Sequence, residues 1–211
     1  KADGEEKEAP KTTIYYVTDV VQQSQYINMF REQKMNAVVL KDNIDNPFIS
    51  HLEAKNEKVK FQRIDAQVTE DFVEEMSEEE IKEKKDTLTE IFKKALGKEN
   101  LDVRVEKMKN EKIASMITMS EETRRMQDMM KMYAMNGMGA MGDFGGETLV
   151  LNVANPLVQY VESHKDGDKT DLFCKQLYDL AMISHKPLEP EEMTEFVMRS
   201  NEIMELLAKE K

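Results

Sequence analysis

Short apolar runs alternate with helical spacings along the first third of the chain. Residues 14–18, 37–40 and 59–64 are rich in β-branched and aromatic side chains, which predicts three strands. Between them, residues 21–34 and 45–55 carry apolar side chains at the spacing of an amphipathic helix. Strand, helix, strand, helix and strand in roughly 50 residues predict a small α/β/α unit, in which a three-stranded parallel sheet has right-handed crossovers.

Charge becomes dense after this unit, over residues 70–85. We interpret this segment as a boundary that runs into a helix. Ser77 and Glu80 have the spacing of a capping box, and Gly97 follows the last apolar position of the helix. The predicted organisation is a disordered leader at 1–11, an α/β/α domain at 12–72 and a second domain at 75–211.

The second domain is predicted to combine a three-stranded sheet with helices. Alternating runs at 101–105 and 113–118 are separated by a short polar turn, which predicts a hairpin. Residues 120–135 form a helix rich in Met, and 147–153 predicts a third strand. The fold class predicted for the whole chain is therefore α+β.

Composition argues against several classes of function. A net charge of −12 disfavours a nucleic-acid surface, which needs clustered Lys and Arg. The longest apolar runs, 37–40 and 148–153, are far too short to span a membrane, and the charged start at 1–11 is neither a signal peptide nor a transit peptide. A single cysteine, Cys174, permits no internal disulfide, so we expect a cytoplasmic protein. The chain lacks an initiator Met, and we expect it to be a piece of something longer.

The sequence contains no constellation typical of catalysis or metal binding. The turn after the first predicted strand, 19–23, has no glycine with which to approach a phosphate, so the sheet is predicted to be a scaffold. His51, His164 and His185 are far apart, and none has the spacing of a metal ligand. Cys174 has apolar neighbours and is expected to be a packed thiol. Two interpretations of the chain remain, a binding module without catalysis and a small α/β nucleotide-binding enzyme domain with a helical appendage. An ATP hydrolysis assay would distinguish them.

The Met-rich helix is the main functional feature of the sequence. Helical spacing places Met126, Met129, Met130 and Tyr133 on one side, which by itself is typical of a stripe that faces a core. A copper(I) site is another interpretation of these thioethers, but metal handling usually recruits Cys or His as well. The stripe alone therefore favours a core.

Further methionines fall outside this stripe, on the helix and in the glycine-rich loop 136–146. Arg124, Asp128 and Lys131 are expected to keep another side of the helix in water. Adaptable apolar side chains in such excess are typical of a surface that binds other chains. The predicted client-binding residues are Met126, Met129, Met130, Met132, Tyr133, Met135 and Met138.

Two amphipathic helices, predicted at 170–184 and 189–208, close the chain. From spacing alone, this pair either completes the chain's own core or joins a second copy in a four-helix bundle across a two-fold axis. The residues of such a bundle would be Phe173, Leu177, Leu180, Ala181, Met193, Phe196, Val197, Ser200, Ile203 and Leu207.

A series of short segments runs in the order found in one protein family. They are Ile14-Tyr15-Tyr16-Val17-Thr18, Ala37-Val38-Val39-Leu40 with Ile44-Asp45, Leu88-Thr89 with Phe92, Glu121-Glu122-Thr123-Arg124-Arg125-Met126, Glu147-Thr148-Leu149-Val150-Leu151-Asn152 with Asn155-Pro156-Leu157, Gln176-Leu177-Tyr178-Asp179-Leu180-Ala181 and Arg199-Ser200-Asn201-Glu202. Through them the chain resembles the ninety-kilodalton heat-shock chaperones, in particular the bacterial HtpG type, from about residue 13 to 207.

This resemblance implies an assignment for each part of the chain. Residues before about 67 correspond to the last α/β/α piece of the family's middle domain, and residues from about 75 to its C-terminal dimerisation domain. The helix at 120–135 corresponds to the family's client-contacting helix, and the helices at 170–208 to its dimer bundle. The implied partners are a second copy of the chain and unfolded or partly folded client proteins, with no nucleic acid and no membrane.

The resemblance also implies what this chain lacks. The family's ATP and magnesium site belongs to an N-terminal domain outside this sequence, so no cofactor and no enzymatic activity are expected here. Eukaryotic cytosolic members end in an acidic tail that docks co-chaperones. This chain ends Leu206-Leu207-Ala208-Lys209-Glu210-Lys211, so those partners are not expected.

Overall fold

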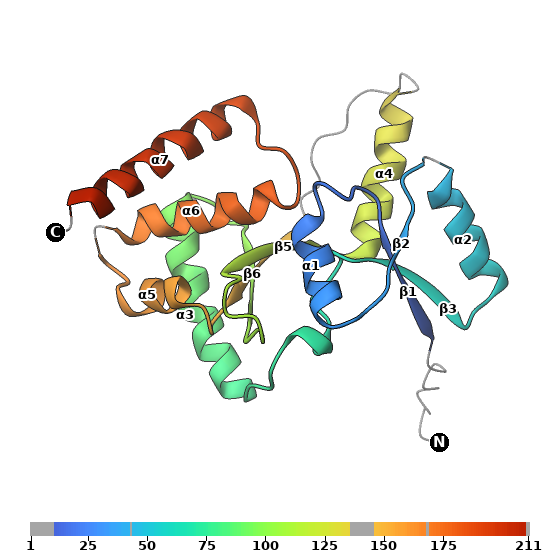
Figure 1. The fold of residues 1–211 in the computed structure, drawn as a ribbon, viewed down its shortest axis with the longest axis horizontal. Coiled ribbons are helices and arrows are strands. Elements are labelled where there is room, and N and C mark those ends of the chain that lie inside the picture. Colours follow the sequence, from blue (N-terminus) through green and yellow to red (C-terminus); the bar gives the residue numbers. More distant parts are fainter. Residues whose placement is uncertain (1–10, 43, 136–145, 168, 210–211) are drawn as a thin grey trace. The chain divides into compact units, whose positions relative to one another are not determined.

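The computed structural model describes residues 11–42, 44–135, 146–167 and 169–209, except for the side chains of 131–135. The chain divides into two compact units, Lys1–Ile64 and Asp65–Lys211, and their elements are labelled in Figure 1. Residues 65–72 group with the second unit. Residues 1–10 of the predicted leader lie outside the described part.

The first unit is the predicted α/β/α layer structure. Its strands lie in the order β2-β1-β3, and both neighbours of β1 are parallel to it. Tyr15 meets Phe30 of α1 edge to face, whereas Tyr16 packs with Ile49 of α2. Because successive residues of a strand face opposite sides, the two helices cover opposite faces of the sheet. The elements are β1 (Thr12–Val17), α1 (Ser24–Glu32), β2 (Val38–Val39), α2 (Asp45–Lys55) and β3 (Val59–Arg63).

The turn between β1 and α1 is closed by its own side chains. The Asp19 carboxylate accepts hydrogen bonds from the Val21 and Gln22 amides, both at 2.9 Å. These bonds lower the pKa of Asp19 below its usual value. Gln23 Oε1 accepts from the amides of Thr18 and Asp19 at 2.8 and 3.0 Å. The backbone amides of this turn therefore bind side chains of the turn itself.

The second unit builds a mixed sheet with helices around it. Its elements are a short 3-10 helix (Glu70–Phe72), α3 (Glu78–Leu96), β4 (Asp102–Glu106), β5 (Ser115–Met119), α4 (Glu121–Met135), β6 (Glu147–Asn152), α5 (Pro156–Ser163), α6 (Thr170–Ile183) and α7 (Pro190–Lys209). With the first unit, the described residues thus form the α+β fold predicted, with two three-stranded sheets. No helix among the described residues is long and apolar enough to cross a membrane.

The predicted hairpin between the first two strands of this sheet is wrong. The order is β4-β6-β5, so β6 lies between the two, parallel to β4 and antiparallel to β5. The connection from β4 to β5 is held by Asn152 at the end of β6. Its side chain accepts from the Met108 amide at 2.9 Å and donates to the carbonyls of Asn110 and Ile113 at 3.1 and 2.7 Å. A buried amide 39 to 44 residues downstream thus replaces the expected turn.

Helices α3, α5 and α6 pack with this sheet around one hydrophobic core. The predicted ends of α3 are confirmed. Ser77 Oγ accepts from the Glu80 amide at 3.3 Å at the start of α3, and Gly97 ends that helix in the left-handed conformation, with φ of 64°. Asn155 caps α5 ahead of Pro156, accepting from the Leu157 amide at 2.9 Å.

Candidate functional site and interaction surfaces

Helix α7 packs on α6 through polar contacts. The Arg199 guanidinium donates to the Asp179 carboxylate and, at 3.0 Å, to Gln176 Oε1. Gln176 Nε2 in turn donates to Ser200 Oγ at 3.1 Å. Burial raises the pKa of Asp179 above its usual value, although Arg199 opposes the rise. We expect this largely buried pair to orient α7 on α6 more than to add stability.

Most apolar side chains of α7 are left on the surface. Arg199 is the one buried residue among the described residues of this helix. Val197 is 49% exposed and Leu207 65% exposed, and Leu180 of α6 is 46% exposed. Phe196 and Ile203 are half-buried. Together with Met193 and Met204, these residues make an apolar face, here called the α6/α7 face.

Two of the residues predicted for a dimer interface belong instead to the chain's own core. Leu177 and Ala181 are each 1% exposed, because this side of α6 packs on β5 and α3. The backbone of Leu177 also accepts a hydrogen bond from Ser115 Oγ at 2.7 Å. Phe173 is half-buried, with its ring 5.1 Å from that of Tyr160. Leu177 and Ala181 are therefore removed from the candidate interface.

Helix α4 carries the predicted Met-rich surface. Ser120 caps it, accepting from the Thr123 amide at 3.2 Å. Met126 and Met129 are 42% and 53% exposed, and Met130 is half-buried. The interpretation of this stripe as core-facing is therefore wrong for Met126 and Met129, which lie on the surface. The side chains of Met132, Tyr133 and Met135, and all of Met138, lie outside the described residues.

The expectation that Arg124 keeps a side of α4 in water is also wrong. Its side chain is buried and its Nη2 lies 3.4 Å from Oδ1 of Asp65, which is fully buried. His185 lies between two carboxylates, 3.8 Å from Asp65 and 3.8 Å from Glu147. Glu147 also pairs with Lys186 at 2.7 Å. We call these five residues the charge cluster.

No local pattern in the sequence could have predicted the charge cluster. Its members come from the start of the second unit, α4, β6 and the segment that follows α6, so only the tertiary fold brings them together. Arg124 alone is indistinguishable in sequence from its solvated neighbours. A buried charge is retained where a partner compensates its desolvation, and Asp65 supplies that partner.

The remaining reactive side chains in the described part of the chain show no catalytic arrangement. Burial raises the pKa of the Cys174 thiol to about 12, which keeps it protonated and unreactive at neutral pH. Among the described residues, no three His, Cys, Asp or Glu side chains are placed to hold a metal ion. The candidate functional features of the described residues are therefore the exposed apolar surfaces, namely the α6/α7 face and the Met-rich side of α4.

Comparison with known proteins identifies the family. A profile of the Hsp90 protein family matches residues 5–210. A relative from Bacteroides thetaiotaomicron named Chaperone protein HtpG is 30% identical over 159 residues, which cover 72% of this chain and 23% of the relative. A protein of the same name from Porphyromonas gingivalis is 29% identical over 155 residues, covering 70% of this chain and 22% of the relative. One from Bacteroides fragilis is 30% identical over 166 residues, which cover 75% of this chain and 24% of the relative.

The chain spans less than a quarter of the length of these curated relatives. The family profile, in contrast, matches nearly all of the chain. The chain therefore belongs to the Hsp90 family of heat-shock chaperones, of the HtpG type.

Proposed function

We propose that this chain is a dimerising, client-holding module of an Hsp90-type chaperone, acting in the bacterial cytoplasm and performing no catalysis itself. Residues 12–72 would belong to the middle domain of the longer protein and residues 75–211 to its dimerisation domain. Two surfaces support the proposal. The α6/α7 face would bind a second copy, and the Met-rich side of α4 would hold partly folded polypeptides.

The observation that carries the proposal is the arrangement of α7. Its polar contacts with α6 leave a long apolar face without cover, including Val197 and Leu207. Contiguous apolar surface of this kind is rare on monomers and typical of interfaces. A helix pair exposed along one side can bury that side against its own copy, because a two-fold axis makes the same face complementary to itself. The proposed interface is Leu180, Met193, Phe196, Val197, Ser200, Ile203 and Leu207, with Phe173 at its margin.

The client surface rests on the exposure of Met126 and Met129. Two methionines in the same helix, one turn apart, expose flexible and polarisable side chains that adapt to many shapes. Beneath them, the buried Arg124 holds the opposite side of α4 against Asp65. The helix is therefore held in place on its buried side and exposes flexible apolar side chains on the other. Such a surface suits binding without sequence specificity.

Aggregation of an unfolding client tests this surface. Replacing Met126 and Met129 with Gln keeps side-chain length and should leave the fold intact, because both residues are exposed. We expect the double variant to lose most of its ability to suppress light scattering by the client. The matched control is Leu157→Gln on α5, where the side chain is equally exposed at 42%. Full protection by the double variant would contradict the assignment of client binding to α4.

Hydrolysis and binding of ATP separate this proposal from the alternative of a small nucleotide-binding enzyme. In the turn after β1, side chains of Asp19 and Gln23 already bind backbone amides that a phosphate would need. We expect calorimetry to detect no saturable ATP binding and phosphate release to stay at background. Saturable binding in the micromolar range would favour the enzyme.

A further inference from the structure

The sheet of the first unit ends in an edge strand that is open to another chain. Leu40 N–H donates to the Val17 carbonyl at 2.8 Å, and Val17 pairs with Val39 in register. In a parallel ladder, alternate residues turn their backbone groups to opposite sides. Val38 and Leu40 therefore face β1, whereas Val39 turns its N–H and C=O outward. In the order β2-β1-β3, no strand of the described residues follows on that side.

The side chains of this edge are apolar and exposed. Val38 is 44% exposed and Val39 is 55% exposed, and the two lie on opposite faces of the sheet. Natural edge strands are usually blunted by charged residues, by proline or by a covering element. Here two valines stand at the edge instead, so the strand remains able to pair with another strand and has an apolar side chain on each face of the sheet.

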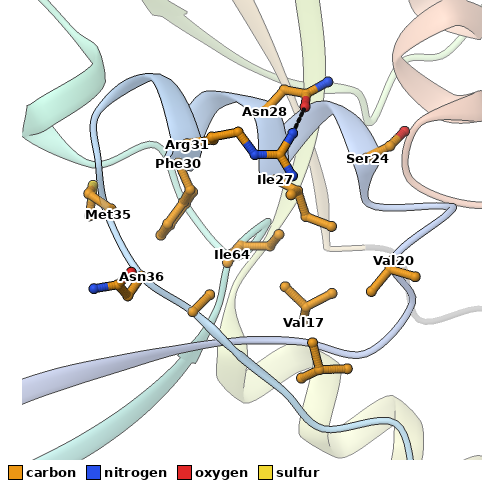
Figure 2. A pocket seen from close by; sticks show the side chains of 12 residues that line it. Val17, Val20, Ser24, Ile27, Asn28, Phe30, Arg31, Met35, Asn36 and Ile64 are labelled. Carbon is orange, nitrogen blue, oxygen red and sulfur yellow. Dashed lines mark hydrogen bonds between the residues drawn. The ribbon is translucent and has the colours of Figure 1, made fainter.

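A groove opens beside the same strand, on the face covered by α1. It has a volume of about 600 Å³ and is lined on the sheet side by Val17, Val39 and Ile64, and on the α1 side by Phe30 and Arg31. Figure 2 shows the Arg31 side chain above the groove with its guanidinium directed to Asn28, to which it donates at 3.1 Å. Among the described residues that line the groove, Arg31 is the one that carries a charge.

We propose that the β2 edge and this groove bind an extended polypeptide segment, which adds to the sheet as a fourth strand beside Val39. The segment would exchange hydrogen bonds with the Val39 N–H and C=O and place an apolar side chain in the groove. Arg31 favours a segment with an acidic residue next to the apolar one.

The occupant follows from the groups that the edge presents. The outward N–H and C=O of Val39 form a donor and acceptor pair at strand spacing, which extended backbone matches. The backbone of a helix is already hydrogen-bonded internally, and a lipid tail offers no donor. Exposed valines on both faces admit an apolar segment whichever way its side chains alternate. This surface belongs to the first unit, whereas α4 and the α6/α7 face belong to the second.

A substitution pair isolates the backbone contact. Val39→Pro removes the outward N–H without removing a bond to β1, and proline is tolerated at such an edge position. Val39→Thr keeps the N–H and nearly the same shape. The probe is a fluorescently labelled peptide with a valine and leucine core flanked by glutamates, titrated against the whole chain by anisotropy. Thermal melting of each variant checks that the first unit stays folded.

We expect saturable binding by the parent and by Val39→Thr, and binding about tenfold weaker by Val39→Pro, the loss expected for a hydrogen bond and its strand pairing. Arg31→Glu should weaken binding of this acidic peptide and improve binding of a lysine-flanked one. The Gln variant of Met126 and Met129 should bind the peptide as the parent does, which separates this surface from the proposed client helix.

Three outcomes would overturn the inference. The first is an absence of binding by the parent. The second is equal binding by folded Val39→Pro and Val39→Thr, which would show that the edge backbone is not used. The third is self-association of the chain that Val39→Pro abolishes, which would make a second copy the occupant of the edge.

Discussion

Arg124 in α4 and Asp65 at the start of the second unit form a buried ion pair, with Nη2 and Oδ1 3.4 Å apart and side chains 7% and 0% exposed. The pair fixes the base of the Met-rich helix to the segment that opens this unit. Because α4 otherwise displays Met126 and Met129 to solvent, this contact gives the exposed helix a defined position.

Removing one partner of this pair should be costly. Arg124→Met keeps the bulk of the side chain but leaves the Asp65 carboxylate without its guanidinium, which should lower the free energy of unfolding by about 3–5 kcal/mol. Urea denaturation followed by circular dichroism measures the loss. The double variant Arg124→Met with Asp65→Leu should recover much of it, since no uncompensated charge then remains. Parent-like stability of the single variant would show that Asp65 does not need Arg124.

Gly146, which precedes β6, is predicted to tolerate no side chain. Its φ is 88°, and a Cβ there would lie 2.6 Å from Cγ2 of Thr123. We expect Gly146→Ala to cost about 2–3 kcal/mol, from the backbone and the contact together. Gly97→Ala is the control, because φ is 64° but the space is open, and it should cost only about 1 kcal/mol. Adding Thr123→Ser, which lacks that methyl group, should rescue part of the Gly146→Ala loss and none of the Gly97→Ala loss.

Burial of the Cys174 thiol should make the second unit less stable at alkaline pH. Its pKa is about 12 in the folded chain against an ordinary value of 9.0. Below 9.0 the thiol is protonated in both states, so its contribution is fully present. As the pH rises toward 12 the unfolded chain ionises first, and stability is lost.

The measurement is the slope of unfolding free energy with pH, compared between the parent and Cys174→Ala. The variant starts less stable because it leaves a small cavity, but it should lose less stability over the alkaline range. Other titrating groups cancel in the difference. Parallel slopes in the two proteins would show that Cys174 is not buried as described.

Local signals predicted the first unit well and the second unit in part. The strands of the first unit are compact β-branched runs with helices between them, so periodicity and the right-handed crossover rule suffice. The second sheet was mispredicted because the pairing of β4 with β6 depends on Asn152, whose side chain holds a connection far away in the sequence. Helix caps at Ser77 and Asn155 were predictable, because each acts within its own first turn.

The surfaces were harder to predict than the fold. Helical spacing identifies the apolar side of α6 but not which residues the chain covers itself, so Leu177 and Leu180 look alike in sequence and differ in exposure from 1% to 46%. In α4, helical spacing likewise failed to show which side faces inward: Met126 was expected on the inward side and is exposed, whereas Arg124 was expected in water and is buried. Which side of an amphipathic helix faces inward is set by its tertiary partners, here Asp65 for Arg124.

Sedimentation velocity of the purified chain tests the central claim most directly. We expect the parent to sediment as a dimer at micromolar concentration. Val197→Asp with Leu207→Asp should sediment as a folded monomer, because unpaired carboxylates in a dry interface should weaken association at least about hundredfold. Leu157→Asp, an exposed control off the α6/α7 face, should remain dimeric. A parent that is monomeric throughout, or a doubly substituted chain that still dimerises, would contradict the account.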